Sequence, residues 1–338
     1  MGKRCLVTGG LGFIGQHLVR LLQQRGHTIR ILDLDRPQQP QPTIDYVQAS
    51  IVDAEPVTQA MADIDWVFHL AANAGLWAPR KQDFLTINQQ GTRTVMAAAQ
   101  AAGVERVVHT STESILKCDR IPADGQETDE SIRLEFDDMV GPYCQGKFLA
   151  EREALAAAAR GLPVVIVNPT IPIGPGDRRL TPPSRMLLGF LNGRYPAFLN
   201  STLNLIDARD VALGHLLAAE KGQVGERYIL GQYQPGIAAT AGAPAADYGA
   251  LHAPAADPLW TGLCHQCGAR ILGRSYYPSS PGGPPNRVRL ARSPLRFSSH
   301  KAQQQLGLTC RPIEVSLADA VQDYQARGLL RRPLPKAV

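Results

Sequence analysis

The chain has 338 residues, of which 44% are apolar and 19% are charged, and its net charge is +5. This composition supplies enough apolar side chains for a large core and argues against intrinsic disorder. The length favours one large α/β domain with a smaller companion. The positive excess is diffuse and predicts no nucleic-acid partner. A solvated basic surface explains it better than an anionic substrate or a membrane surface.

Three further features bear on where the protein works. The chain starts directly with a strand-like segment at residues 3–7, so we expect no cleaved signal peptide. It contains no run of about 18 apolar residues, so we expect no membrane-spanning helix. Its six cysteines are scattered, which predicts free thiols and a cytoplasmic protein rather than a disulfide framework.

Short apolar runs alternate with helical patterns through the first half of the chain. Strands are predicted at residues 5–8, 29–32, 45–48, 65–70, 106–110 and 164–167. Helices are predicted between them at residues 13–25, 83–102 and 143–160. Strands that alternate with helices favour a parallel, doubly wound sheet, so the predicted fold class is a Rossmann-type α/β fold.

The pattern changes beyond Pro169. Several prolines interrupt residues 171–204, which we expect to form loops and one helix over a cleft. A helix at 210–219 and a strand at 228–230 follow, and a last amphipathic helix is predicted at 314–327. The apolar face of this last helix is formed by Val315, Leu317, Ala320, Val321 and Tyr324.

Residues 232–288 differ from the rest, because they are rich in alanine, proline and glycine without an apolar period. Two explanations are open: translation in a shifted reading frame, or divergence into a lid. Cys264 and Cys267 resemble half of a zinc site. No second ligand pair stands at a suitable spacing, so no metal is predicted.

A glycine-rich turn joins the first predicted strand to the first predicted helix. Gly9, Gly12 and Gly15 permit a tight turn, close approach of a pyrophosphate, and close packing of the helix on the sheet. Phe13 and Ile14 open the helix, whose N-terminus presents unpaired N–H groups and a positive dipole end to phosphates. This context favours a dinucleotide site over an ordinary glycine-rich turn.

Asp33 ends the second predicted strand, eighteen residues after Gly15. A carboxylate at this position can accept hydrogen bonds from the adenosine ribose hydroxyls and would repel a 2′-phosphate, so NAD is predicted over NADP. Arg36 keeps NADP open as the second choice, because a guanidinium can pair with that phosphate.

Tyr143 and Lys147 lie four residues apart at the start of a predicted helix, so their side chains share one face. A nearby ammonium favours a phenolate, and we therefore expect Lys147 to lower the pKa of Tyr143 toward the working range of an acid–base group. Thr110 and Thr112 end the fifth strand, where the ligand crevice of a doubly wound sheet lies. A hydroxyl there can hydrogen-bond the substrate oxygen and align it with Tyr143.

These motifs together resemble the extended short-chain dehydrogenases/reductases, the NAD-dependent epimerase/dehydratase family. Thr8–Gly15 is similar to the TGGxGFIG fingerprint, His69–Ala72 to the fourth-strand motif, and Asn88–Thr92 to the central-helix motif N-x-x-G-T. The resemblance covers residues 3–231 and about 289–330. The residues that align with the catalytic set of this family are Thr112, Tyr143 and Lys147.

The resemblance implies cofactor contacts along the carboxyl edge of the sheet, and a homodimer formed through the two long central helices. The expected cofactor-binding residues are Gly9, Gly12, Phe13, Ile14, Gly15, Asp33, Ser50, Ile51, Leu70, Ala71, Ala72, Asn88, Thr110, Tyr143, Lys147, Asn168 and Pro169. Residues 1–170 with 205–231 are expected to form the NAD-binding domain. Residues 171–204 with 232–338 are expected to form a smaller C-terminal substrate-binding subdomain.

The predicted reaction is hydride transfer between nicotinamide and a secondary alcohol or ketone. The resemblance is to hopanoid-associated sugar epimerases, dihydroflavonol reductases and 3β-hydroxysteroid dehydrogenases. It implies first a nucleotide-sugar epimerase-like or dihydroflavonol-reductase-like enzyme, with a 3β-hydroxysteroid dehydrogenase-like enzyme as the alternative. A nucleotide sugar is favoured by Arg178, Arg179, Arg185 and Arg194. An apolar ketone or alcohol is favoured by Trp77, Tyr195 and Phe198.

Two alternative activities were weighed. Glu113 follows Thr112 as in the Thr-Asp-Glu motif of sugar-nucleotide 4,6-dehydratases, but Ser114 leaves that set incomplete, so dehydration is not predicted. A dinucleotide-binding sensor without turnover is the alternative from another functional class. The intact Tyr143 and Lys147 argue against it.

Overall fold

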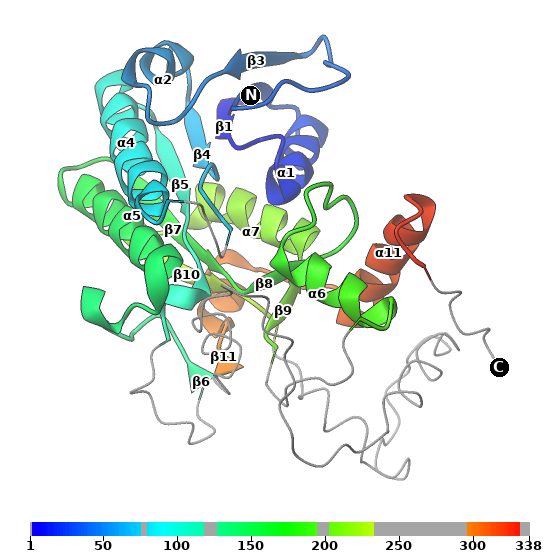
Figure 1. The fold of residues 1–338 in the computed structure, drawn as a ribbon. Coiled ribbons are helices and arrows are strands. Elements are labelled where there is room, and N and C mark those ends of the chain that lie inside the picture. Colours follow the sequence, from blue (N-terminus) through cyan, green and yellow to red (C-terminus); the bar gives the residue numbers. More distant parts are fainter. Residues whose placement is uncertain (1, 76–79, 118–126, 195–202, 233–295, 332–338) are drawn as a thin grey trace.

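The computed structural model describes residues 2–75, 80–117, 127–194, 203–232 and 296–331 (Figure 1). Within these ranges, seven parallel strands form the central sheet, in the order β3-β2-β1-β4-β5-β7-β10. They are β1 (Arg4–Thr8), β2 (Thr28–Asp33), β3 (Ile44–Gln48), β4 (Trp66–His69), β5 (Arg106–Thr110), β7 (Val164–Pro169) and β10 (Arg227–Leu230). The chain runs from β1 to one edge and returns beside β1 at β4, which confirms the doubly wound Rossmann-type fold.

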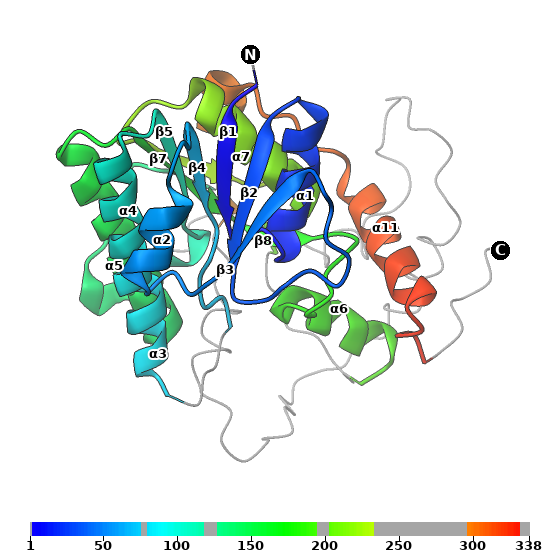
Figure 2. The ribbon, with the colours of Figure 1, turned by 90° about the horizontal axis from the view of Figure 1, so that it is seen from above.

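Helices cover both faces of this sheet (Figures 1 and 2). On one face lie α1 (Phe13–Gln24) and α7 (Ala208–Lys221), which pack against each other. On the other face lie α2 (Ala54–Ala60), α4 (Gly91–Ala102) and α5 (Gly141–Ala159). Because both faces are covered, strands such as β7 are apolar and buried along their length.

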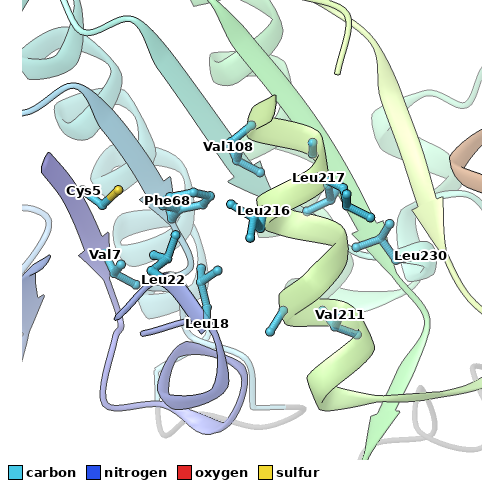
Figure 3. Packing of buried hydrophobic residues seen from close by; sticks show 14 of the residues in the cluster. Cys5, Val7, Leu18, Leu22, Phe68, Val108, Val211, Leu216, Leu217 and Leu230 are labelled. Carbon is cyan, nitrogen blue, oxygen red and sulfur yellow. The ribbon is translucent and has the colours of Figure 1, made fainter. Parts of the chain in front are cut away.

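The core beneath α1 and α7 is a continuous apolar layer (Figure 3). Figure 3 labels Cys5, Val7, Leu18, Leu22, Phe68, Val108, Val211, Leu216, Leu217 and Leu230 in this layer. The layer on the opposite face is built from α2, α4 and α5 against the same strands. The carboxyl ends of the strands are therefore held at one edge by two independent cores.

The predicted helix at 83–102 is interrupted. It consists of α3 (Gln82–Phe84), a π-helical turn at Leu85–Gln90, and α4. A Cβ atom on Gly146 of α5 would lie 2.6 Å from the Phe84 carbonyl oxygen, so α5 approaches this turn closely. The widened turn places Asn88 inside the protein.

The prolines of residues 171–204 do not prevent regular structure there. Besides α6 (Pro182–Leu191), this stretch contains β8 (Ile171–Ile173), which pairs in parallel with β9 (Leu205–Asp207). The expectation of loops and one helix was therefore incomplete. The two-stranded sheet is short, which lets it include Pro172 despite the missing N–H group.

The C-terminal helix α11 (Ile313–Ala326) packs on α6, β8 and β9. Ala320 and Tyr324 are buried as the helical period predicted, but Val315 is 46% exposed, so its assignment to the apolar face was wrong. The helix buries Ile313 and Ser316 on that turn instead. Its buried face is narrower than the sequence indicated.

The remaining described elements are short. A parallel pair joins β6 (Glu127–Thr128) to β11 (Arg296–Phe297), and single helical turns occur at Glu113–Ile115, Phe136–Asp138 and Ala302–Leu306. Among the described residues, no helix combines the length and the apolar character that crossing a membrane requires. Sequence predictions that lie outside the described residues concern Trp77, Tyr195, Phe198 and residues 233–288 with Cys264 and Cys267.

Replacing Leu22 by alanine tests the core under α1. Leu22 is fully buried, so Leu22→Ala should lower the free energy of unfolding by about 2–5 kcal/mol. Urea unfolding followed by circular dichroism measures the change. Leu34→Ala is the matched control, because Leu34 is 62% exposed. An equal loss in both variants would contradict the packing described.

Candidate active site

The glycine-rich turn is held tightly against the neighbouring strands. Gly9 has a φ of +71°, and a Cβ atom on it would lie 2.8 Å from the Ala71 nitrogen. A Cβ atom on Gly15 would lie 2.2 Å from the Gly9 carbonyl oxygen. These positions therefore require glycine for two reasons, the left-handed backbone of Gly9 and the close approach at Gly15.

The N-terminus of α1 is suited to bind an anion. Gly12 is the N-cap and offers no side chain to the first helical N–H groups, and the first turn contains no acidic residue. Phe13 and Ile14 begin the helix beside the turn. Open N–H groups and the positive dipole end together fit a pyrophosphate.

Asp33 lies beside the glycine-rich turn, at the carboxyl end of β2. Its Oδ2 accepts a hydrogen bond from the Leu11 N–H at 3.1 Å, and its Oδ1 accepts one from the Asp35 N–H at 3.3 Å. The side chain is only partly buried, so the carboxylate stays available to an adenosine ribose. Asp35 itself forms an ion pair with Arg179.

The segment after β3 brings the predicted pair Ser50 and Ile51 to the same edge of the sheet. Ser50 Oγ accepts a hydrogen bond from the Val52 N–H at 3.4 Å. Ile51 is buried and lies against α4, where a Cβ atom on Gly91 would be 2.5 Å from its Cδ1. Both residues therefore lie near the carboxyl end of β3, and their contact with an adenine stays a prediction.

The end of β4 is fixed by a buried histidine. His69 Nδ1 hydrogen-bonds Thr8 Oγ1 at 2.8 Å, and its Nε2 hydrogen-bonds Thr92 Oγ1 at 3.1 Å. Burial lowers the pKa of His69 to about 3, so the ring stays neutral. Thr8 Oγ1 also accepts from the Ala71 N–H, and this positions the partly buried segment Leu70–Ala72 over the glycine-rich turn.

Asn88 holds the loop that follows this segment. Its Oδ1 accepts from the Asn73 N–H at 2.7 Å, and its Nδ2 donates to the Asn73 carbonyl at 3.2 Å. A side-chain amide that bonds both backbone groups of one residue fixes the local backbone. Asn88 therefore positions the loop after β4, and a direct cofactor contact stays a prediction.

Lys147 reaches the end of β5. Its Nζ donates to the Thr110 carbonyl oxygen at 2.6 Å, and the side chain is buried. Burial lowers the pKa of Lys147 to about 8, while the nearby charge of Glu151 acts in the opposite direction. Thr110 Oγ1 hydrogen-bonds His215 Nε2 at 2.7 Å. The end of β5 is therefore hydrogen-bonded from α5 on one face of the sheet and from α7 on the other.

Tyr143 lies one turn before Lys147 on α5, and its ring packs edge-on against Phe84 at 6.3 Å between centroids. Burial raises the pKa of Tyr143; a hydrogen bond with Thr112 partly opposes the rise, and the charge of Glu113 adds to it. The expectation that Lys147 lowers this pKa was therefore wrong here. The Lys147 ammonium is bonded to the Thr110 carbonyl, and burial of the phenol dominates.

Thr112 is linked to Glu113 as well as to Tyr143. Its hydroxyl donates to Glu113 Oε2 at 2.9 Å, and its Oγ1 accepts from the Ser114 N–H at 3.2 Å. Glu113 is buried and forms an ion pair with Lys117 at 3.3 Å. Glu113 is therefore a buried, ion-paired carboxylate rather than a solvated one.

The end of β7 completes the site. Asn168 and Pro169 are buried there, and Asn168 Nδ2 donates to the Thr112 carbonyl at 3.2 Å and to Glu151 Oε2 at 2.9 Å. The sequence analysis had no role for Glu151. Its spacing of four residues from Lys147, on the same helix face, is the signal that would have found it.

The predicted site residues thus converge from separate elements on one edge of the sheet. The turn after β1 and the ends of β2, β4, β5 and β7 meet there because all these strands are parallel. The uncapped helix end and the glycine contacts fit a dinucleotide, and the phenol and ammonium lie at β5. In the part of the chain that the structure describes, no three His, Cys, Asp or Glu side chains gather as metal ligands.

Comparison with known proteins identifies the family. A model of the NAD dependent epimerase/dehydratase family matches residues 5–231. The chain belongs to this family. It is an NAD-dependent enzyme of the extended short-chain dehydrogenase/reductase type, as the ordered sequence motifs predicted.

Relatives match along nearly the whole chain. The putative dihydroflavonol 4-reductase of Synechocystis sp. is 38% identical over 337 residues, which cover 96% of this chain and 95% of that protein. The sterol demethylase protein B of Methylococcus capsulatus is 30% identical, with 96% of this chain and 99% of that protein covered.

Solved structures agree with the fold. The crystal structure of gox2253 superposes with a TM-score of 0.76 at 29% identity, covering 98% of this chain and 100% of that one. MoeE5, in complex with UDP-glucuronic acid and NAD, superposes with a TM-score of 0.73 at 24% identity, covering 96% and 99%. At that identity the second match supports the fold alone.

Replacing Gly15 by alanine tests the dinucleotide turn. The new Cβ atom would clash with the Gly9 carbonyl oxygen and displace the turn from α1. We expect NADH affinity, measured by fluorescence titration, to fall at least about tenfold, which is about 1.4 kcal/mol. Gly103→Ala is the control: its positive φ gives a stability loss of roughly 1–2 kcal/mol, but no atom lies within 4 Å. Equal NADH affinity in Gly15→Ala and wild type would refute this assignment.

Replacing Glu113 by glutamine tests the electrostatics around Tyr143. The negative charge of Glu113 raises the pKa of the phenol, so Glu113→Gln should lower that pKa. Alcohol oxidation needs the phenolate, so kcat for oxidation rises as the phenol loses its proton. In Glu113→Gln this rise of kcat should therefore occur at a pH lower by roughly one unit. The measurement is kcat against pH.

The control for this variant is Glu105→Gln. Glu105 lies just before β5 and pairs with the exposed Lys3. Its removal should leave the pH profile of alcohol oxidation unchanged. A Glu113→Gln profile that coincides with wild type would show that Glu113 does not act on the phenol.

Proposed function

We propose that the protein is a reductase or dehydrogenase that acts on an apolar ketone or secondary alcohol with net turnover of NAD(H). The observation that carries this proposal is the position of Tyr143 and Lys147, one turn apart on α5, beside the carboxyl end of β5. One side chain hydrogen-bonds Thr112 and the other Thr110. A proton-transfer pair is thereby placed at the crevice where doubly wound folds bind their ligands.

When bound, NAD(H) supplies or accepts the hydride. The chain itself handles the proton on the substrate oxygen. The raised pKa of Tyr143 keeps its hydroxyl protonated at neutral pH, so it can donate to a developing alkoxide during reduction. Lys147 stays charged below about pH 8 and adds a positive charge at the same strand end. Thr112 orients the substrate oxygen when its hydroxyl, which donates to Glu113 in this structure, turns to the substrate.

The proposed cofactor contacts favour NAD over NADP. The Asp33 carboxylate lies beside the glycine-rich turn, where it can accept from ribose hydroxyls and repel a 2′-phosphate. Arg36, the residue that keeps NADP as the second choice, is exposed, and the neighbouring Asp35 pairs with Arg179. The uncapped N-terminus of α1 holds the pyrophosphate in this proposal.

An apolar substrate is preferred because the arginines that favoured a nucleotide sugar lie exposed, and one of them is already paired with a carboxylate. Arg178 and Arg185 are exposed, and Arg179 bonds Asp35. Two of the relatives matched along nearly their whole length carry the names of a putative dihydroflavonol 4-reductase and a sterol demethylase protein. A nucleotide-sugar epimerase is the second candidate, because a protein of the same fold binds UDP-glucuronic acid.

Three further proposals follow from the sequence motifs. Residues 1–170 with 205–231 bind the dinucleotide, and residues 171–204 with 232–338 contribute to substrate binding.

The protein forms a homodimer through α4 and α5, which pack side by side on one face of the sheet (Figure 1). It works in the cytoplasm, where reduced Cys5, Cys144 and Cys310 would be stable. Sedimentation mass and cell fractionation test the last two.

Replacing Tyr143 by phenylalanine tests the proposed activity. The assay follows NADH oxidation with a panel of dihydroflavonols, 3-ketosteroids, 3-oxo acids and UDP-sugars. Wild type should oxidise NADH stoichiometrically with an apolar ketone. Tyr143→Phe should lower kcat by about 10²–10⁴-fold and leave NADH affinity within a small factor, because only the proton donor is lost.

Tyr46→Phe is the matched control, since Tyr46 lies on the edge strand β3 and its hydroxyl accepts a hydrogen bond from Gln41. UDP-sugar conversion without net NADH use would favour the epimerase. Equal absence of turnover in wild type and Tyr143→Phe, with NADH binding retained, would favour a dinucleotide-binding sensor.

A further inference from the structure

Glu151 is a buried charge next to the candidate active site that the proposed mechanism does not use. It lies on α5 one turn beyond Lys147 and is 3% exposed. Its Oε2 accepts from Asn168 Nδ2 at 2.9 Å, and its Oε1 accepts from Arg227 Nη1 at 3.2 Å. A carboxylate in this position needs partners, because burying an unpaired charge is strongly unfavourable.

The contact with Asn168 fixes the orientation of that amide. Asn168 Nδ2 carries two hydrogens, and the two acceptors that receive them are Glu151 Oε2 and the Thr112 carbonyl. Neither acceptor can bond the amide oxygen, so the amide has one permitted orientation. Through this amide, Glu151 is connected to the backbone of Thr112, whose hydroxyl lies beside Tyr143.

Arg227 holds the other side of the carboxylate. Its Nη2 donates to the carbonyl oxygens of Glu130 and Ile132, so the guanidinium is fixed by backbone as well as by Glu151. Arg227 is the first residue of β10, next to β7 and Asn168 in the sheet. The Glu151 carboxylate is therefore held in place and cannot rotate toward Lys147 or away from it.

Lys147 has few charged neighbours. On its own helix, Glu151 lies one turn after it and Tyr143 one turn before it. From β4 and β5, His69 and His109 face it, and burial keeps both rings neutral. The Thr110 carbonyl supplies its hydrogen-bond acceptor. Of these groups, Glu151 is the carboxylate, and its charge acts to raise the pKa of Lys147.

We propose that Glu151 is a positioning residue that orients the Asn168 amide against Thr112 and supplies the negative charge that keeps Lys147 an ammonium ion. The proposal rests on the proposed function of Tyr143, Lys147 and Thr112. One buried carboxylate thus has two effects: it fixes the backbone of Thr112 after β5, and it favours the charged form of Lys147. A merely structural ion pair with Arg227 would have only the first effect.

The test is Glu151→Gln, which keeps a hydrogen-bond acceptor for Asn168 and removes the charge. Lys147 is charged below its pKa of about 8, and losing a nearby negative charge moves that pKa further down. The ammonium is then lost at lower pH. Competitive acetylation with trace acetic anhydride, read by peptide mass spectrometry on the cofactor-free protein, should show the Lys147 pKa lower by roughly one unit.

The second readout is kinetic. The alkaline limb of kcat against pH should move to lower pH by the same amount in Glu151→Gln. The matched control is Glu153→Gln on the same helix, where Glu153 pairs with Arg93 at the surface. This control should leave both the Lys147 pKa and the kcat profile at wild-type values.

A double variant, Glu151→Gln with Arg227→Met, separates charge from structure. Glu151→Gln alone leaves the Arg227 charge buried without its carboxylate, which should lower the midpoint of thermal unfolding. The double variant removes both charges, so its midpoint should lie closer to that of wild type, while the Lys147 pKa stays low. If the Lys147 pKa is unshifted in both Glu151→Gln and the double variant, the proposal is overturned. The acetylation readout needs no substrate, so a wild type without turnover would refute the proposed function and leave this test intact.

Discussion

The backbone at the carboxyl end of β5 is the feature on which the candidate site depends. Lys147 donates to the Thr110 carbonyl, and Asn168 donates to the Thr112 carbonyl. From the other face of the sheet, His215 hydrogen-bonds the Thr110 hydroxyl. Three separate elements thus converge on Thr110 and Thr112, two at backbone carbonyls and one at the Thr110 hydroxyl. A shift of this strand end would move the lysine, the threonine hydroxyl and the phenol together.

The parallel arrangement of the strands explains why so many polar side chains gather at the carboxyl edge of the sheet. Strands β1, β4, β5 and β7 end at the same edge, and the cores under α1 with α7 and under α4 with α5 hold them there independently. Some of the polar groups at that edge are paired with one another, as in the bonds of His69 to Thr8 and Thr92, whereas the His109 ring and Asn168 Oδ1 have no partner among the described residues. Neutral histidines satisfy buried hydroxyls without adding charge near the dinucleotide turn.

Much of this arrangement could be predicted from the sequence, because it rests on local patterns. Alternation of strands and helices predicted the sheet, and glycine spacing predicted the turn whose close contacts the structure shows. What could not be predicted depends on contacts distant in sequence. The π-helical turn at Leu85–Gln90 begins where Gly146 of α5 lies close to Phe84, and the role of Glu151 follows from Asn168 and Arg227. The pKa of Tyr143 follows from burial, which a one-turn spacing to Lys147 does not reveal.

The charges around the site also bear on the direction of the reaction. Burial and Glu113 favour the protonated phenol of Tyr143, while Glu151 favours the protonated amine of Lys147. Both carboxylates therefore stabilise the acid form of the pair by their negative charge, Glu113 at Tyr143 and Glu151 at Lys147. A site prepared in its acid form is suited to deliver a proton to an oxygen that becomes negative. Ketone reduction creates such an oxygen, and alcohol oxidation requires the same phenol first to lose its proton.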